Sequence, residues 1–473
     1  MTLLHDLTAL LGPAHVLTGA DCDRFAHDWT GNYKGRPLAV IRPADTAQVA
    51  ASLRLAAQHG VPVVPVSGNT GLVGGTYTEG GLLVSLERMN RIREIRRDAR
   101  IAVVEAGVIL SRLHDAAEAE GLYFPLWFGA RGSAMIGGVL STNAGGSNVL
   151  RYGSTRGLCL GLEVVLADGR VLDLMSMLHK DNSGYDLKNL FIGAEGTLGI
   201  ITAAVMKLVP APRAHATATL ALRSLPDALS LLNRLQEVTG GAVEAFEFMP
   251  ASYLERLRAV RPDLGLPFAD IPEVTILVEL GATAPHLAVA DADGVVPLAA
   301  LLEQALADLM AQGLVADAVI AASEAQRRAM WARREAAAEI TFAVRPFIDT
   351  DIAVPLDRVA DFLTGIHDRL PALDAGAGTL AVAHLGDGNV HFTVFPSRKD
   401  AALHDAVVEA IEDVVADLGG SFSAEHGVGL SKRNSMARRK DPVALDVMRA
   451  VKAALDPEGR MNPGKVIPGV AAS

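Results

Sequence analysis

Two histidines, His384 and His391, flank a glycine-containing turn in the stretch VAHLGDGNVHFTVF at residues 382–395. Asp387-Gly388 is a typical two-residue hairpin turn, and apolar residues alternate on both sides of it. A turn centred there pairs His384 directly with His391 on the neighbouring strand. Directly opposed residues have Cβ atoms roughly 4.5 to 5.5 Å apart, so the two imidazoles can converge on one metal ion. The alternative is a surface hairpin that carries two half-exposed histidines.

A carboxylate and a third imidazole follow in the segment SAEHG at residues 423–427. Two histidines with Glu425 form an open ligand set, because three nitrogen and oxygen ligands leave a position for water or substrate. Structural zinc sites usually fill all four positions with protein groups, often thiolates. In a regular strand Glu425 and His426 would point to opposite faces, so both can serve one site only where the backbone is irregular.

Three glycine-rich segments occur in the first half of the chain, at residues 67–75, 132–146 and 192–202. The first, SGNTGLVGG, follows a predicted buried strand, so its backbone N–H groups can approach a pyrophosphate without obstruction by side chains. It is not the GxGxxG dinucleotide fingerprint, and the chain contains no GxxxxGK[ST] motif. The alternative is a set of tight turns without a ligand. Two such loops nevertheless indicate a long cofactor with a flat part.

The elements that must position these residues follow from hydrophobic periodicity and from helix and strand end signals. An amphipathic helix is expected at the N-terminus, where Pro13 ends it. The first half is then expected to contain helices at 45–59 and 110–120, strands at 61–66, 82–86 and 101–105, and a hairpin over 162–174. The second half is expected to contain strands at 216–222 and 275–280 and helices at 225–239, 298–313 and 323–340.

A composition change at Pro210-Ala-Pro212 marks a predicted domain boundary. The strands and helices beyond it predict an α+β layer with an antiparallel sheet. On the helix predicted from a capping box at Ser323, the side chains of Met330, Arg334 and Ala338 share one stripe. An arginine among apolar neighbours snorkels or pairs with an acid unless it has a functional partner, so Arg334 alone leaves these interpretations open.

Composition excludes several classes of protein. The 473 residues are 50% hydrophobic and 21% charged, which is typical of a soluble globular chain with two or three domains. The net charge of -11 argues against a surface for nucleic acid or anionic membranes. Cys22 and Cys159 are too few for a disulfide framework or an iron–sulfur cluster, which fits a reducing cytoplasm. No signal peptide or bilayer-spanning run is expected, so any membrane link would be peripheral.

Taken in order, six segments resemble the FAD-dependent 2-hydroxy-acid dehydrogenases of the vanillyl-alcohol-oxidase type of flavin fold. They are PVSGNTGLVGG, GSAMIGGVLSTNAGG, NLFIGAEGTLGIIT, AHLGDGNVH, SAEHGVG and LDPEGRMNPGK, and together they cover nearly the whole chain. Members of this family include D-2-hydroxyglutarate dehydrogenase, D-lactate dehydrogenase and the flavin subunit of glycolate oxidase. The resemblance implies an FAD-binding domain of the PCMH type with two subdomains at residues 1–212. It also implies an α+β cap domain with an antiparallel sheet at 213–425 and a C-terminal segment at 426–473 that returns to the FAD domain.

The resemblance also implies roles for individual residues. His384, His391 and Glu425 would be the metal ligands, His426 the proton acceptor, and Arg334 the clamp for the substrate carboxylate. The flavin is expected to be non-covalent, because the first glycine loop contains neither His nor Cys. The residues expected to contact FAD are Gly68, Asn69, Thr70, Gly71, Leu72, Ser133, Gly137, Gly138, Thr142, Asn143, Gly145, Gly146, Glu195, Ile200, Ile201 and Asn462.

The chemistry of these groups agrees with that expectation. A 2-hydroxy acid can chelate a divalent ion, which lowers the pKa of its hydroxyl group. A histidine such as His426 suits the role of proton acceptor at neutral pH, while the hydride leaves to flavin N5. Zn²⁺ is the expected metal, although Mn²⁺, Co²⁺ and Fe²⁺ accept the same ligands. The electron acceptor is expected to be a quinone, an electron-transfer flavoprotein or a cytochrome, and a homodimer is an open alternative to a monomer.

Three departures from the family concern the substrate. Members that act on dicarboxylates tend to have lysine, threonine and asparagine where this chain has Asp349, Ala338 and Thr393. An aspartate repels a second carboxylate, so the sequence favours D-lactate or a related D-2-hydroxy acid whose far end is neutral or cationic. The alternatives are a D-2-hydroxyglutarate dehydrogenase or glycolate oxidase subunit, a metal-free sugar or alcohol oxidase, and a non-catalytic flavin-binding subunit of an oxidase complex.

Overall fold

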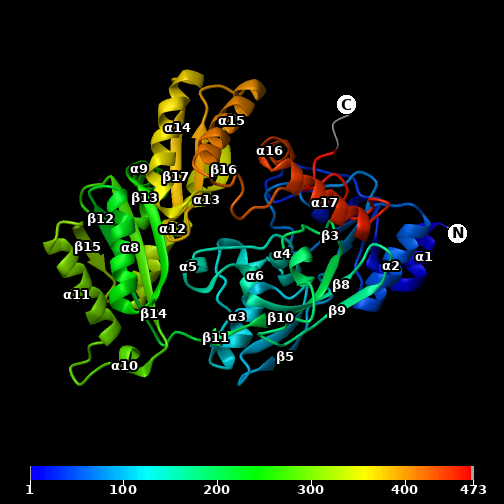
Figure 1. Cartoon of the computed structure of the whole chain (residues 1–473), viewed down its shortest axis with the longest axis horizontal. Coiled ribbons are helices and arrows are strands. Elements are labelled where there is room, and N and C mark those ends of the chain that lie inside the picture. Colours follow the sequence, from blue (N-terminus) through cyan, green and yellow to red (C-terminus); the bar gives the residue numbers. More distant parts are fainter. Residues whose placement is uncertain (1, 470–473) are drawn as a thin grey trace. The chain divides into compact units, whose positions relative to one another are not determined.

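A computed structural model describes residues 2–469 of the chain, which divides into two compact units (Figure 1). Unit 1 comprises the described residues of Met1–Gly145, Gly153–Pro210 and Glu425–Ser473, and unit 2 comprises Gly146–Tyr152 and Ala211–Ala424. The division therefore differs from the expected contiguous domains, because the short segment 146–152 belongs to unit 2 and Glu425 to unit 1. Among the described residues, no helix combines the length and the apolar character that a bilayer crossing requires.

The first part of unit 1 is a four-stranded sheet with the order β1-β2-β4-β3, in which β4 pairs in parallel with both β2 and β3. The predicted amphipathic first helix, α1, buries Leu3, Leu7 and Leu11 on one face. The Asp45 side chain caps the next helix by accepting the Gln48 backbone N–H at 2.8 Å, as the sequence predicts. The elements are α1 (Leu3–Leu11), β1 (Val16–Leu17), β2 (Ala39–Ile41), α2 (Thr46–Gln58), β3 (Val63–Val66) and β4 (Leu82–Ser85), with short 3₁₀ helices at Pro13–His15 and Gly19–Phe25.

The second part of unit 1 is an antiparallel five-stranded sheet with the order β5-β6-β10-β8-β9. Its buried strands pack against α3 and α4 in one apolar cluster. The elements are β5 (Ile92–Arg96), β6 (Ile101–Glu105), α3 (Leu110–Ala119), β7 (Leu122–Tyr123), a 3₁₀ helix (Gly129–Gly132), α4 (Ile136–Ser141), α6 (Thr155–Leu158), β8 (Cys159–Val165), β9 (Val171–Leu174), α7 (Lys188–Phe191), β10 (Ile200–Lys207) and β11 (Val209–Pro210).

The C-terminal part of the chain completes unit 1 through α16 (Arg433–Arg439), α17 (Pro442–Leu455) and the turn that follows. Val63 on β3 donates its N–H to the Arg460 carbonyl at 2.9 Å and accepts the Asn462 N–H at 2.8 Å. The Lys465 ammonium group donates to the Tyr77 carbonyl at 2.8 Å. The LDPEGRMNPGK segment thus lies against the first sheet.

Unit 2 is built on an antiparallel seven-stranded sheet with the order β15-β12-β14-β13-β17-β18-β16, which confirms the predicted α+β class. Its strands are β12 (Ala214–Leu222), β13 (Val243–Pro250), β14 (Val274–Ala282), β15 (Val315–Ile320), β16 (Ile348–Ala353), β17 (Gly378–His384) and β18 (Asn389–Phe395). Its helices are α5 (Val149–Tyr152), α8 (Pro226–Thr239), α9 (Ala251–Val260), α10 (Pro285–Ala288), α11 (Pro297–Ala311), α12 (Glu324–Glu335), α13 (Ala337–Phe342), α14 (Val359–Leu373) and α15 (Ala401–Asp417), with 3₁₀ helices at Pro262–Leu264 and Leu356–Arg358.

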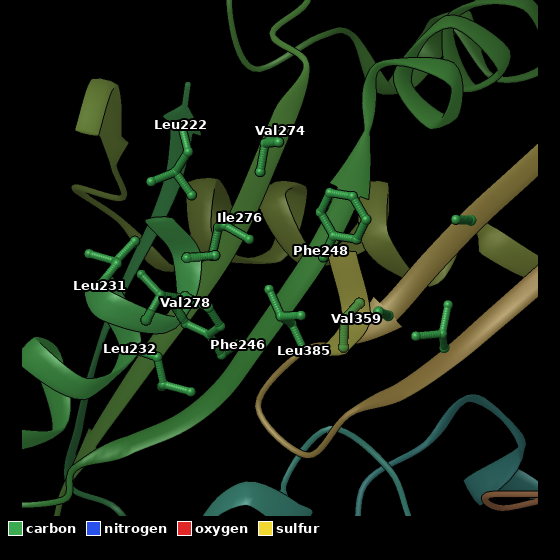
Figure 2. Close-up of a cluster of buried hydrophobic side chains, with 14 of the residues drawn as sticks. Leu222, Leu231, Leu232, Phe246, Phe248, Val274, Ile276, Val278, Val359 and Leu385 are labelled. Atoms are coloured by element: carbon green, nitrogen blue, oxygen red, sulfur yellow. The ribbon is translucent and has the colours of Figure 1, made fainter. Parts of the chain in front are cut away.

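The two faces of this sheet have different chemistry. One face packs apolar side chains, including Phe246, Phe248 and Ile276, against α8, α11, α14 and α15. Figure 2 shows these three side chains together with Leu231 and Leu232 of α8. Because successive side chains of a strand alternate between faces, Glu247 on β13 points to the other face. There α9, α12 and α13 supply a second, smaller apolar cluster. The opposite face therefore has a polar region next to its own apolar core.

Candidate active site

The hairpin that carries His384 and His391 has a register different from the predicted one. His384 pairs with Asn389, and His391 pairs with Val382, so residues 385–388 form a four-residue turn. A two-residue type I′ turn needs positive φ at both central residues, but only Gly388 of the Asp387-Gly388 pair has it, at +81°. The direct pairing of the histidines was therefore wrong by two residues.

The two histidines still lie together. A shift by two residues preserves the face to which a side chain points, because the period of a strand is two. The ring centroids of His384 and His391 are 5.6 Å apart, with an interplanar angle of 79°. The sequence therefore predicted the juxtaposition for a reason that survives the error in register.

A buried carboxylate lies behind His384. The carboxylate of Glu247, which is completely inaccessible to solvent, is 2.9 Å from His384 Nδ1. The Arg334 Nε–H donates to the same carboxylate at 2.8 Å, and the Arg334 guanidinium lies 3.5 Å from His384 Nδ1. Arg334, His384 and Glu247 therefore form one polar cluster inside unit 2.

His391 has a similar neighbour. The carboxylate of Asp351, also inaccessible to solvent, lies 3.9 Å from His391 Nδ1, which is an ion-pair distance and not a hydrogen bond. The Asn389 side-chain amide donates to Asp351 at 3.0 Å and holds it in place. In metal sites, a carboxylate at one imidazole nitrogen orients the other nitrogen toward the ion. The two imidazoles and their carboxylates therefore fit a divalent metal.

Opposing effects set the pKa of Glu247. Burial raises the pKa of this carboxyl group, but the charges of His384 and Arg334 and their hydrogen bonds outweigh the effect of burial. The net pKa lies below the ordinary value, so Glu247 is an anion at neutral pH.

The backbone near Arg334 departs from the single predicted helix. The structure contains α12 and α13 in place of one helix, with a break at Ala336. The buried hydroxyl of Tyr253 donates to the carbonyls of Arg333 at 2.7 Å and Arg334 at 3.1 Å, next to this break. Met330 and Arg334 are buried on the predicted stripe, whereas Ala338 is exposed.

Unit 1 contains a cavity between the glycine-rich segments. Close packing makes glycine necessary in its walls: a Cβ atom on Gly68 would lie 2.2 Å from the Ser133 carbonyl oxygen, and one on Gly137 would lie 2.8 Å from Ala106 Cβ. Among the described residues that line the cavity, none is Lys or Arg, so a phosphate there would be held by backbone N–H groups. The cavity therefore fits a cofactor with a pyrophosphate and an apolar ring.

Most of the residues expected to contact FAD line this cavity. They are Gly68, Asn69, Thr70, Gly71, Leu72, Gly137, Gly138, Thr142, Gly145, Glu195, Ile200 and Ile201, and the catalytic candidates Glu425 and His426 line it with them.

Four of the residues expected to contact FAD lie elsewhere. The Ser133 carbonyl packs on Gly68, and the Asn143 side chain accepts the Arg156 backbone N–H at 2.9 Å. The Asn462 amide donates to the carbonyls of Gly75 at 3.0 Å and Glu195 at 2.8 Å. These three residues therefore brace the loops instead of lining the cavity. Gly146 is the first residue of unit 2.

Glu195 links two of the predicted segments. Its carboxylate accepts the backbone N–H groups of Val428 at 2.7 Å and Gly429 at 2.8 Å, two and three residues after His426. Burial raises the pKa of Glu195, although the two N–H donors act in the opposite direction. Residues 424–426 form a bend, which meets the condition of irregular backbone that Glu425 and His426 require.

Sequence reasoning missed the functional surroundings of these residues. Glu247 had a signal, because it is an acid between two phenylalanines on β13. Asp351 had none, because β16 contains two aspartates and a threonine. The loop-holding contacts of Glu195 had no local signal, because Val428 lies 233 residues away in the chain.

Comparisons with known proteins bear on both units. Residues 37–175 match the family model described as FAD binding domain, and residues 211–466 match that of FAD linked oxidases, C-terminal domain. The chain is 38% identical over 444 residues to mitochondrial D-2-hydroxyglutarate dehydrogenase of Bos taurus, covering 93% of this chain and 79% of that protein. It is 35% identical to D-2-hydroxyglutarate dehydrogenase of Stutzerimonas stutzeri over 98% of both chains.

The chain belongs to the FAD-linked 2-hydroxy-acid dehydrogenase family. As a member of this family it is an FAD-dependent oxidoreductase that acts on the CH–OH group of a small 2-hydroxy acid. This confirms the resemblance, the enzyme class and the FAD cofactor expected from the sequence.

Solved structures of other proteins have a fold similar to that of this FAD-linked dehydrogenase. p-Cresol methylhydroxylase has a TM-score of 0.71 at 16% identity, over 98% of this chain and 96% of that one. 4-Ethylphenol oxidase from Gulosibacter chungangensis has a TM-score of 0.69 at 19% identity, over 98% and 97%. Both likenesses show that the fold is shared, and they confirm the expected vanillyl-alcohol-oxidase type.

Proposed function

We propose that this FAD-linked dehydrogenase oxidises a D-2-hydroxy acid to the 2-oxo acid with the help of a divalent metal held by His384, His391 and Glu425. The observation that carries the proposal is the pair of imidazoles on one sheet face, each with a buried carboxylate near its Nδ1 atom. Zn²⁺ is our first choice of metal, and Mn²⁺, Co²⁺ and Fe²⁺ accept the same ligand set.

The covalent chain supports the choice of Glu425 as third ligand. Ala424, the last residue of unit 2, donates its backbone N–H to the Asp351 carbonyl at 3.2 Å. Asp351 is the register partner of His391. Glu425 follows Ala424 directly, so a single peptide bond separates the proposed ligand from a residue anchored at this strand.

The roles of the protein groups follow from their chemistry. When bound, FAD accepts a hydride and the metal lowers the pKa of the substrate hydroxyl. Arg334, fixed through its Nε atom, directs its remaining N–H groups to the substrate carboxylate. His426 accepts the hydroxyl proton, a contribution of about 10²- to 10⁴-fold in rate. Glu195 holds the backbone that follows His426.

The surroundings of His391 bear on the substrate. Thr393 and Asp349 are cross-strand partners joined by a hydrogen bond from the Thr393 hydroxyl to the Asp349 carboxylate at 2.7 Å. By strand alternation, both point to the same face as His391. Asp349 is exposed there, so it adds negative charge beside the proposed metal ligands. We propose a substrate whose far end is neutral or cationic, with D-lactate as its simplest member.

D-2-Hydroxyglutarate is the second candidate substrate. The curated relatives quoted above are named D-2-hydroxyglutarate dehydrogenases and are 35–38% identical over most of the chain. Asp349 decides between the candidates, because a second carboxylate would meet like charge. In an Asp349→Lys variant we expect kcat/KM for D-2-hydroxyglutarate to rise at least tenfold while that for D-lactate changes little. Steady-state kinetics on both acids tests this, and an unchanged ratio between the substrates would remove Asp349 as a determinant.

An anaerobic panel of D- and L-2-hydroxy acids, scored by bleaching of the flavin absorbance with and without a chelator, tests the proposal as a whole. We expect D-lactate to bleach the flavin faster than D-2-hydroxyglutarate, and we expect the chelator to suppress bleaching. Fast reaction of L-acids or full activity in chelator would contradict it. We further propose a cytoplasmic location, and a quinone, an electron-transfer flavoprotein or a cytochrome as electron acceptor. Adding each of these acceptors to the reduced enzyme tests which one reoxidises the flavin.

A further inference from the structure

Glu247 lies where the negative charge of a carboxylate needs hydrogen-bond donors or positive charges to replace water. It is completely buried near the middle of β13, between Phe246 and Phe248 of the apolar face. A buried carboxylate without partners is strongly unfavourable, so the groups that hold Glu247 are tightly constrained to it. Its two partners are His384 and Arg334, which are also the proposed ligand and the proposed substrate clamp.

The contact with His384 has a chemical consequence. Nδ1 lies 2.9 Å from the carboxylate, which is an acceptor only, so Nδ1 carries a proton both in the charged ring and in the neutral ring to which a metal binds. The lone pair is then on Nε2, the atom that a metal needs. Without the carboxylate, the ring is free to adopt the other tautomer and to rotate.

The contact with Arg334 fixes the guanidinium in the same way. Its Nε–H is used by Glu247 at 2.8 Å, so rotation of the planar group is restricted and the remaining N–H groups keep one direction. One carboxylate thus holds two groups that would act on different parts of the substrate.

We propose that Glu247 is a positioning residue that holds His384 in the metal-binding tautomer and Arg334 in the carboxylate-binding orientation. The inference rests on the proposed metal-assisted function. It implies that loss of Glu247 weakens metal binding and substrate binding together, although Glu247 contacts neither.

The decisive variant is Glu247→Gln, which keeps the size of the side chain. The carboxylate meets Arg334 and His384 through different oxygens, and an amide has only one oxygen, so its NH₂ group must face one of the two partners. In the FAD-loaded enzyme stripped of metal, we expect the affinity for Zn²⁺, measured by competition with a chromogenic chelator, to fall roughly 10- to 100-fold. With saturating metal, we expect KM for the 2-hydroxy acid to rise at least tenfold.

The chain offers a matched control on the same strand. Glu244 is also buried and is also held by an arginine and near a histidine, Arg151 at 2.8 Å and His215 at 3.5 Å. These partners are not proposed ligands. In Glu244→Gln we therefore expect a lowered melting temperature with unchanged Zn²⁺ affinity and unchanged KM.

If Glu247→Gln does not fold, the inference can still be tested by a measurement on the unmodified enzyme. Selective ¹⁵N labelling of histidine, with His384 assigned through a His384→Ala variant, reports which ring nitrogen carries the proton in the metal-free protein. A proton on Nδ1 supports the inference, and a proton on Nε2 alone overturns it. A folded Glu247→Gln enzyme with wild-type Zn²⁺ affinity and KM also overturns it. If the wild-type enzyme itself binds no metal, the proposed function fails first, so the two failures are distinguishable.

Discussion

At the scale of residues, the proposed site is defined by buried acids whose partners are distant in sequence. His384 and Glu247 are 137 residues apart, and Glu195 and Val428 are 233 residues apart. Each acid satisfies two donors that would otherwise be poorly oriented. Such pairs are costly to break, because removing one partner leaves a desolvated group without compensation.

The separation of ligand and cofactor residues predicts the effect of His384→Ala. The cavity that fits FAD is lined by residues of unit 1 alone, and His384 belongs to unit 2. We therefore expect turnover to fall by at least 10³-fold while the ratio of FAD to protein, read from the absorbance spectrum, stays at the wild-type value. Activity close to wild type would remove the metal-assisted mechanism.

The sequence contained the site's metal and acid–base candidates, but not their supports. The residue types of HLGDGNVH and AEHG led to the proposed chemistry because imidazole and carboxylate groups are uncommon in such spacing. Glu247 remained hidden, because an acid in an apolar strand acquires meaning only when the neighbouring strand and its register are known.

At the scale of elements, the glycines of the first glycine-rich loop of unit 1 differ in whether their surroundings leave room for a Cβ atom. Gly68 packs so closely that a Cβ atom would overlap the Ser133 carbonyl oxygen, whereas a Cβ atom on Gly71 would meet nothing within 4 Å. We expect Gly68→Ala to lose most of its bound FAD, because the two loops must move apart. Gly157→Ala on α6, which is outside the cavity and where an added Cβ atom also meets nothing within 4 Å, is the control and should retain FAD. Equal FAD content of the two purified variants would contradict this interpretation of the cavity.

A histidine on α3 predicts pH dependence of stability. Burial lowers the pKa of His114 to about 4, and its Nε2 atom lies 2.9 Å from the Leu126 carbonyl oxygen. The unfolded chain binds the proton near pH 6.5, so stability is complete above that pH and is lost as the pH falls toward 4. The loss is about 3 kcal/mol at 1.36 kcal/mol per pKa unit.

We expect His114→Gln to remove this part of the pH dependence. Denaturant unfolding between pH 7 and pH 4 measures it, with His404→Gln at an exposed position of α15 as control. Parallel stability curves for wild type and His114→Gln would contradict the assignment.

The elements that were predicted from the sequence have local signals. Asp45 caps α2 as predicted, and the apolar alternation of β12 and β14 defined strands in the correct places. The turn at residues 385–388 and the break at Ala336 could not be predicted. The first depends on the φ angles of two adjacent residues, and the second lies beside a hydrogen bond from the hydroxyl of Tyr253, a residue of another helix.

At the scale of the whole molecule, the two units are interleaved in sequence. Residues 146–152 are held in unit 2 by Arg151, which donates to Glu244 at 2.8 Å and to the Gly281 carbonyl at 2.6 Å. No change in composition marks residue 146 or 425, so a boundary based on Pro210-Ala-Pro212 alone predicted contiguous domains.

The composition of the cavity predicts how the flavin is retained. Among its described lining residues, His426 is the one histidine and there is no cysteine. A His426 that accepts the substrate proton needs its ring nitrogen, so we expect no covalent bond between this residue and the flavin. We expect purified protein to be yellow and to release intact FAD into the supernatant after denaturation and precipitation. Flavin that sediments with the polypeptide would show a covalent link.

The pairing of the C-terminal segment with β3 has a consequence for biosynthesis. Asn462 donates its side-chain amide to the carbonyls of Gly75 and Glu195 and so connects two loops of the flavin cavity. Val63 forms backbone hydrogen bonds to Arg460 and Asn462, the two neighbours of Met461. These residues emerge from the ribosome after all the strands of both units. The nascent chain can thus complete the sheet of unit 2 while the cavity of unit 1 still lacks the hydrogen bonds of Asn462. Stable binding of the cofactor is therefore expected only after residue 462 has been translated.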